Sequence, residues 1–257
     1  MSEESSHDDA RALRRIIERS RSIVFFGGAG VSTESGIPDF RSAAGLYKAQ
    51  SEYGHRPETI LSAEFFATEP ETFFDYYFGN LVHPDAQPGP AHRALAALEN
   101  RGQLASVVTQ NIDGLHGLAG SRNVLELHGS GQRNHCLQCG RRFGLEAVMA
   151  LAGVSPGRLA GANVPRCECG GIVRPDVVLY GEPLPGGVTE GAIREIAAAD
   201  TLVIGGTSLA VYPAAGLIRY FQGDSLVLIN LTPTTADASA DLVIHQPIGE
   251  TLAPFMH

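Results

Sequence analysis

The four cysteines of the chain form two closely spaced pairs that could bind a metal ion. Two residues separate Cys136 from Cys139, and one separates Cys167 from Cys169. In a reducing compartment, cysteine pairs of this kind usually bind metal as thiolates. Four thiolates suit tetrahedral zinc, and a shell of four protein ligands leaves no position for a substrate or an activated water. We therefore predict one structural Zn²⁺; four unrelated buried thiols or two disulfides are the alternatives.

Two glycine-rich segments could bind phosphate. Residues 28–32 read GAGVS and follow a short apolar run, and residues 206–208 read GTS and follow another. Glycine lets backbone N–H groups approach a pyrophosphate, and a helix that starts there adds its positive end. The third glycine of G-x-G-x-x-G is absent after Gly30, so a plain tight turn explains the first segment equally well.

Polar side chains that could hold a ribose or move a proton follow three further apolar runs. Gln110, Asn111 and Asp113 come directly after one run, His128 follows the next, and Asn230 ends a third. A lone histidine is more often structural than catalytic. One that ends a strand and precedes a glycine is nevertheless well placed for proton transfer.

These side chains must be positioned by a sheet. Short β-branched runs predict strands at residues 22–26, 105–109, 124–127, 177–180, 202–205, 226–230 and 242–245. Helical patterns cover residues 10–20, 90–100 and 189–199. Buried strands that alternate with helices indicate a parallel sheet covered on both faces, which binds ligands beyond the carboxyl ends of its strands. Residues of about 37–90 and 131–172 interrupt the alternation and are interpreted as two insertions.

The charge balance restricts the partners. Nineteen Lys and Arg against twenty-eight Asp and Glu give a net charge of −9, which disfavours binding to nucleic acid or to an anionic membrane through a broad basic face. The longest apolar stretch, residues 196–218, contains Asp200 and Pro213 and suits a buried strand and loop better than a membrane span. The first nine residues are acidic and polar, so we expect a disordered N-terminus without a targeting signal and a cytoplasmic protein.

Seven motifs together resemble one protein family. They are GAGVSTESGIPDFR (28–41), TQNID (109–113), LHG (127–129), the two cysteine pairs, RPDVVLYGE (174–182), GTSLAVYPAA (206–215) and LIN (228–230). In this order they resemble the sirtuins, which are NAD-dependent protein lysine deacylases. The resemblance covers residues of about 10–252. It implies an α/β fold: one catalytic domain over residues 10–257, with a Rossmann-like NAD-binding core, a helical insertion and a zinc-ribbon insertion.

The resemblance also implies a role for particular residues. The NAD site would comprise Gly28, Ala29, Gly30, Ser32, Ile37, Asp39, Phe40, Arg41, Gln110, Asn111, Ile112, Asp113, His128, Gly206, Thr207, Ser208 and Asn230. His128 would be the general base and Asn111 a second catalytic residue. An acetyl-lysine peptide would add as a strand to Val177, Val178, Leu179, Tyr180, Gly181 and Glu182. The products would be lysine, nicotinamide and 2′-O-acetyl-ADP-ribose. Separately, we expect the protein to be a monomer.

The sequence also limits which acyl groups the enzyme is expected to remove from lysine. Sirtuins that favour acidic acyl groups carry a Tyr-x-x-Arg pair in the helical insertion. Here Gly79 and Asn80 lie three residues after Tyr76 and Tyr77, and no arginine occurs between Arg56 and Arg93. A buried acyl carboxylate would therefore stay unpaired. We expect acetyl or longer apolar acyl groups rather than succinyl or malonyl groups.

Three other functions are alternatives to deacylation. Mono-ADP-ribosyl transfer would use the same activated ribose with a protein nucleophile, but the presence of His128 favours deacylation. An NAD-binding module without turnover would be favoured by loss of His128 or Asn111, and both are present. A hydride-transferring dehydrogenase fits poorly, because nothing in the sequence resembles a separate substrate domain.

Overall fold

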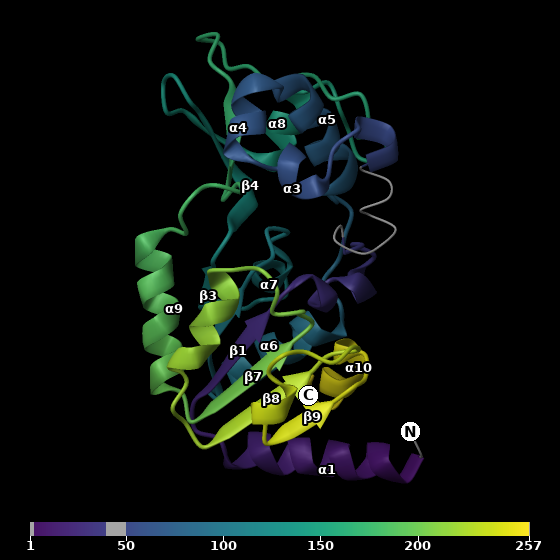
Figure 1. The fold of residues 1–257 in the computed structure, drawn as a ribbon, viewed down its shortest axis with the longest axis vertical. Helices are drawn as coiled ribbons and strands as arrows, with labels where there is room; N and C mark the ends of the chain where they lie inside the picture. The colour runs from purple at the N-terminus through teal and green to yellow at the C-terminus, as the bar shows by residue number, and fades with distance from the viewer. Residues whose placement is uncertain (1–2, 40–49, 257) are drawn as a thin grey trace.

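A six-stranded parallel sheet forms the centre of the computed structural model, which describes residues 3–39 and 50–256 (Figure 1). Its strand order is β3-β2-β1-β7-β8-β9. The strands are β1 (Ile23–Gly27), β2 (Leu104–Thr109), β3 (Val124–Glu126), β7 (Thr201–Gly205), β8 (Ser225–Ile229) and β9 (Leu242–Ile244). Six of the seven predicted strands are therefore confirmed, and the sheet has the order of a dinucleotide-binding fold with its reversal between β1 and β7.

Side chains from both faces of this sheet are buried. Phe25 packs on one face, whereas Val24 and Phe26 pack on the other. The first face is covered by α1 (Glu3–Arg19), α6 (Pro90–Asn100) and α10 (Ile248–Leu252), and the second by α9 (Gly186–Ala198) and the 3-10 segment η3 (Ala214–Tyr220). Continuous apolar strands are what a two-sided covering requires, because successive side chains point to opposite faces.

The register brings the strand ends to one edge. Gly27 at the end of β1 pairs with Thr109 on β2 and with Gly205 on β7, and Gly205 pairs with Ile229 on β8. The segments that follow these strands therefore leave the sheet side by side. This is the edge at which the sequence placed its candidate residues.

The two insertions share one core in the structure. The first contributes α3 (Pro57–Ile60), α4 (Ala63–Thr68) and α5 (Pro70–Asn80), and the second contributes β4 (Gly129–Cys136), β5 (Arg142–Gly144), α8 (Leu145–Leu151) and β6 (Val173–Val177). Aromatic side chains of α4 and α5 pack against α8 and the β4–β6 sheet. We call these elements together the small module; Figure 1 shows them above the carboxyl edge of the large sheet, opposite α1.

Two sequence expectations differ from the structure. The strand predicted at residues 177–180 is not in the parallel sheet, because β6 ends at Val177 and pairs antiparallel with β4. Helix α1 begins at Glu3, so residues 3–9, expected to be disordered, belong to its first turns. No Pro or Gly interrupts residues 3–19, so nothing stops the helix from extending. In the described part of the chain, no helix is both long and apolar enough to span a membrane.

Candidate active site

A cavity of about 210 Å³ lies between the carboxyl edge of the parallel sheet and the small module. Its predicted lining residues are Ala29, Ser32, Ile37, Gln110, Asn111, Ile112, Asp113, His128 and all six residues 177–182. Residues that the sequence placed in four separate segments therefore meet in one pocket. Several apolar wall residues carry no chemical signal in the sequence and were missed: Leu61, Leu81, Leu184, Val211 and Pro213.

The glycines after β1 and β7 let two loops touch. The Gly30 N–H donates to the Gly206 carbonyl oxygen at 2.8 Å, and a Cβ on Gly30 would lie 2.7 Å from Gly206 Cα. Gly206 has a φ of +58°, and a Cβ there would lie 2.5 Å from the Val31 nitrogen. Side chains at either position would force the loops apart. The expected helix start after Gly28 is instead two 3-10 turns, at Ala29–Val31 and Thr33–Ser35.

Gln110 joins the ends of three strands. Its side-chain amide donates to the Thr207 hydroxyl at 3.1 Å and to the Gly27 carbonyl oxygen at 3.4 Å, and its backbone N–H also donates to Gly27. The Thr207 hydroxyl in turn accepts the Leu209 N–H. Gln110 therefore fixes the relative position of the β1, β2 and β7 ends beside the pocket.

The Ser32 hydroxyl is the centre of a buried hydrogen-bond cluster. It donates to Asp113 Oδ2 at 2.7 Å and accepts from Asn111 Nδ2 at 3.0 Å. His92 Nε2 lies 3.4 Å away. Because the Gly89 N–H donates to His92 Nδ1, the neutral ring carries its proton on Nε2 and faces Ser32 as a donor.

A hydroxyl has one proton and two lone pairs, so this cluster uses the full capacity of Ser32. The hydroxyl therefore orients Asn111 and Asp113 rather than offering a donor to a phosphate. The amide of Asn111 turns its nitrogen toward Ser32, which leaves Oδ1 as an acceptor at the pocket.

His128 follows β3 and is held at both its ring and its backbone. Its Nδ1 lies 2.9 Å from the Gln110 carbonyl oxygen, and its own carbonyl oxygen accepts the Val178 N–H. A carbonyl oxygen can only accept, so Nδ1 carries a proton and the neutral ring has its lone pair on Nε2. This is the tautomer that a general base acting through Nε2 requires.

Two further histidines lie behind the pocket and stay neutral. Burial lowers the pKa of His92 to about 4, with Arg93 lowering it further and Asp113 opposing the shift. Burial lowers the pKa of His116 to about 3, with His92 contributing. The two rings are 4.7 Å apart, and neither nitrogen of His116 has a hydrogen-bond partner among the described residues.

This pair predicts a loss of stability in acid. Both folded-state pKa values lie below the ordinary value of 6.5, so the unfolded chain binds more protons below that pH and the free energy of unfolding falls as the pH drops toward 4. At pH 5 each ring accounts for about 2 kcal/mol of the loss. We expect His116→Phe to remove about half of the combined effect, measured by urea unfolding at pH 7.5 and pH 5.0. An unchanged difference between the two pH values in the variant would contradict this origin.

The segment of residues 177–182 crosses from the sheet of the small module to the pocket. The Val178 N–H donates to the His128 carbonyl oxygen at 2.9 Å. Tyr180 pairs with the small module, because its N–H donates to Leu61 and its carbonyl oxygen accepts from Ala63. The segment is thus extended and fixed to both halves of the molecule.

The remaining predicted NAD residues are spread along the sheet edge. Gly28 is buried against Thr207, Ser208 is exposed, and Asp39 is half-buried. Asn230 directly follows β8, and its side-chain amide donates to the Thr232 carbonyl oxygen at 2.7 Å. Phe40 and Arg41 lie outside the described residues.

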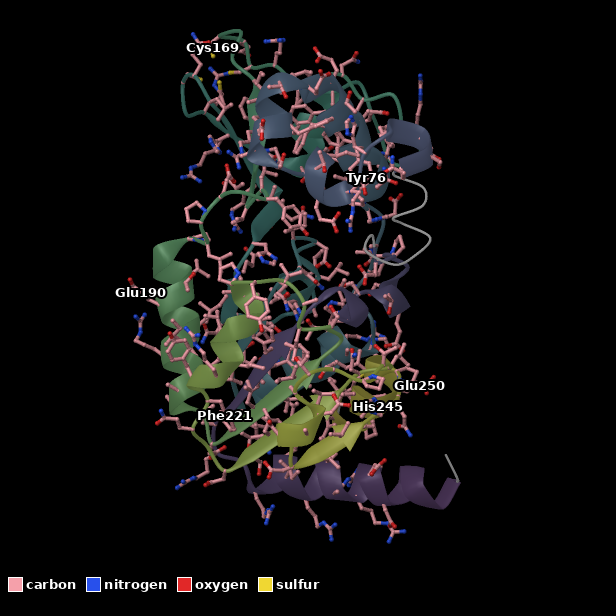
Figure 2. The ribbon with its side chains drawn as sticks, in the orientation of Figure 1. Tyr76, Cys169, Glu190, Phe221, His245 and Glu250 are labelled. Atoms are coloured by element: carbon pink, nitrogen blue, oxygen red, sulfur yellow. The ribbon has the colours of Figure 1, made fainter. Side chains whose placement is uncertain are left out.

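The four cysteines form one cluster that fits a tetrahedral metal. Their sulfurs all lie within 4.8 Å of one another. The sulfurs of Cys136 and Cys169 are 3.5 Å apart and those of Cys139 and Cys167 are 3.8 Å apart, so neither pair forms a disulfide. None of them lines the pocket, and Cys169 lies at the tip of the small module (Figure 2). Gly171 belongs to the same site, because a Cβ there would lie 2.7 Å from Cys136 Sγ.

The acidities of the thiols also fit a bound cation. The N–H groups of Cys139 and Gln138 lower the pKa of Cys136 to about 6. Although the Gly171 N–H lowers the pKa of Cys169, hydrogen bonds shared with Cys136 and Cys139 raise it to about 12. Four thiols this close cannot all ionise unless a cation offsets their repulsion, and a Zn²⁺ ion held by the four sulfurs would supply that charge.

Comparisons with known proteins agree with this geometry. The family model described as "Sir2 family" matches residues 28–213. An NAD-dependent protein deacetylase of Clostridium acetobutylicum is 52% identical over 95% of this chain and 97% of its own. That of Cutibacterium acnes is 54% identical over 94% and 95%.

Solved structures show the same fold. A Sir2 homologue in complex with NAD has a TM-score of 0.81 and 37% identity, over 96% of this chain and 92% of its own. A Sir2 enzyme bound to an inhibitor, 2′-O-acetyl-ADP-ribose and a deacetylated p53 peptide has a TM-score of 0.80 and 33% identity, over 96% and 97%.

Proposed function

The chain belongs to the Sir2 family, and we propose that it is an NAD-dependent protein lysine deacetylase in which His128 is the general base. The observation that carries the proposal is one pocket that joins His128 and Asn111 to the glycine loops of the sheet edge and to the extended segment of residues 177–182. Each of these three parts serves one reactant or one step.

The residues of the sheet edge suit NAD. The glycine loops after β1 and β7 meet at the point where the strand order reverses, which is where such sheets bind dinucleotides. When bound, NAD supplies a ribose carbon that accepts the acetyl oxygen as nicotinamide leaves. We assign Gly28, Ala29, Gly30, Gly206, Thr207 and Ser208 to its phosphates and adenosine side, with Asn230 beyond them. Ile37, Asp39, Phe40, Arg41, Gln110, Ile112 and Asp113 complete the site.

His128 and Asn111 do the chemistry in this proposal. The Gln110 carbonyl oxygen holds the proton on His128 Nδ1, so Nε2 takes a proton from a ribose hydroxyl. Ser32 accepts a hydrogen bond from the Asn111 nitrogen, so Oδ1 remains as the acceptor that can stabilise the positive charge developing on the ribose. The apolar wall around them excludes water that would otherwise intercept the activated ribose.

An acetylated lysine in a protein or peptide is the proposed substrate, bound by Val177, Val178, Leu179, Tyr180, Gly181 and Glu182. The Val178 carbonyl oxygen accepts no hydrogen bond from the described residues and is available to an added strand. We further propose a cytoplasmic monomer with a single catalytic domain over residues 10–257 and with no nucleic-acid or membrane partner. The net charge of −9 supports the last point.

The acyl pocket predicts a strong preference against acidic acyl groups. Tyr77 and Asn80 line it beside Leu61 and Leu81, and its described lining residues include no lysine or arginine. A succinyl carboxylate would lie unpaired near Asp113, so we expect kcat/KM for a succinyl-lysine peptide to be at least about 100-fold below that for its acetyl counterpart.

Peptide turnover with NAD, followed by mass spectrometry, tests both the function and this preference. A propionyl-lysine peptide is the matched control, because it lengthens the acyl chain without adding charge. Failure to remove the acetyl group from the acetyl-lysine peptide would contradict the deacetylase proposal. Faster removal of succinyl than of acetyl would overturn only the acyl assignment.

A further inference from the structure

The turn at the end of the substrate segment is closed by a carboxylate. The Glu182 N–H donates to the Leu179 carbonyl oxygen at 3.0 Å, and Gly181 between them has a φ of +91°. The Glu182 side chain then folds back and accepts the Leu179 N–H at 2.9 Å. Both backbone polar groups of Leu179 are therefore used by Glu182.

Arg174 fixes this carboxylate to the rest of the segment. Its Nη2 donates to the same Glu182 oxygen and, at 3.1 Å, to the Val177 carbonyl oxygen. Its guanidinium carbon also lies 5.5 Å from the centre of the Phe66 ring on α4. One arginine thus ties both ends of the segment to each other and to the small module.

The charges of this pair are maintained despite partial burial. The side chains of Arg174 and Glu182 are only 19% and 24% exposed. Burial opposes ionisation of Glu182, but hydrogen bonds from Arg174 and from the Leu179 N–H keep its pKa below the ordinary value. A charge-assisted pair with several fixed donors restrains the backbone around it.

The restrained backbone is the one that meets the substrate. Val178 lies between the two points that Arg174 and Glu182 hold, and its N–H donates to the carbonyl oxygen of His128. Neither the Val178 carbonyl oxygen nor the Gly181 N–H has a partner among the described residues, so both can bind an added strand.

We propose that Arg174 and Glu182 are a positioning pair that holds residues 177–182 in the conformation to which the substrate peptide binds. The pair therefore affects the affinity for the peptide and not the affinity for NAD. The inference rests on the proposed function. Arg174 acts through the segment, at a distance from the glycine loops that we assign to NAD. Loss of the pair should loosen the peptide edge while the strand ends of the large sheet stay in place.

Steady-state kinetics of Glu182→Gln and Arg174→Lys test this. We expect the peptide KM of each variant to rise about tenfold, with kcat and the NAD KM changed less than about threefold. Arg174→Met should raise the peptide KM more than Arg174→Lys does, because lysine keeps a positive charge beside Glu182.

Glu99→Gln is the matched control. Glu99 is a buried carboxylate that accepts the N–H groups of Arg122 and Asn123 and lies near the Arg122 guanidinium, but it does not line the pocket. It should lower thermal stability without moving the peptide KM. If the Glu182→Gln protein does not fold, the peptide KM of the Arg174→Lys protein tests the proposal instead.

The outcomes separate the two proposals. A wild-type protein that never turns over the peptide contradicts the proposed function itself. An active wild type whose Arg174→Lys variant keeps the wild-type peptide KM, or raises both KM values equally, overturns the positioning pair alone.

Discussion

Replacing His128 by alanine is expected to lower kcat for deacetylation by about 10²–10⁴-fold, the usual contribution of a general base. The expectation rests on the tautomer: Nδ1 keeps its proton and donates a hydrogen bond to the Gln110 carbonyl oxygen, so only Nε2 can take a proton from the substrate. Alanine removes that acceptor and leaves the backbone bond to Val178 intact. Rates of peptide deacetylation for the two proteins at saturating NAD and peptide measure the effect.

His55→Ala is a suitable control, because His55 is exposed and does not line the pocket. It should keep the wild-type rate. Circular dichroism and zinc content should be unchanged in both variants. A His128→Ala protein that deacetylates within about tenfold of the wild-type rate would remove His128 from the role of base.

Removing the metal is expected to unfold the small module and abolish activity. Binding of structural zinc is worth about 10–16 kcal/mol in isolated zinc-binding peptides, which is as large as the whole stability of a typical domain. Here the buried Cys136 and Cys167 also belong to the hydrophobic core of the module. The strand that leads into the substrate segment, β6, pairs with β4, which ends at Cys136.

Chelation and Cys136→Ser both test this. We expect one zinc per chain by elemental analysis, a lower thermal midpoint and loss of peptide turnover in the metal-free or substituted protein. Returning zinc to the chelated wild type should restore activity, whereas Cys136→Ser should not recover. An active, folded protein without bound metal would show that the cluster needs no ion.

Much of the parallel sheet could be predicted because its signals are local. Runs such as residues 202–205 are apolar at every position, and each ends abruptly in glycine or a polar residue. The run at residues 177–180 has the same composition, yet its segment leaves the antiparallel β6. Pairing partners far along the chain decide which sheet a short strand joins, and composition does not record them.

The site was predictable to the extent that its residues are chemically distinctive. His128 and Asn111 carry polar groups where a strand ends, and both line the pocket. The link between Ser32 and His92 was not foreseen, because His92 lies within a helix 60 residues away and gives no signal of its own. Likewise, Gly30 and Gly206 predict a phosphate site from the sequence, but the structure shows that they also allow two loops to touch.

Nicotinamide release from NAD, measured with and without an acetyl-lysine peptide in wild type and His128→Ala, tests the central claim most directly. Release by the wild type that requires the peptide and matches the amount of deacetylated lysine would agree with the account, with much slower turnover to product in the variant. Release that proceeds equally without the peptide would contradict it and indicate NAD hydrolysis or ADP-ribosyl transfer instead.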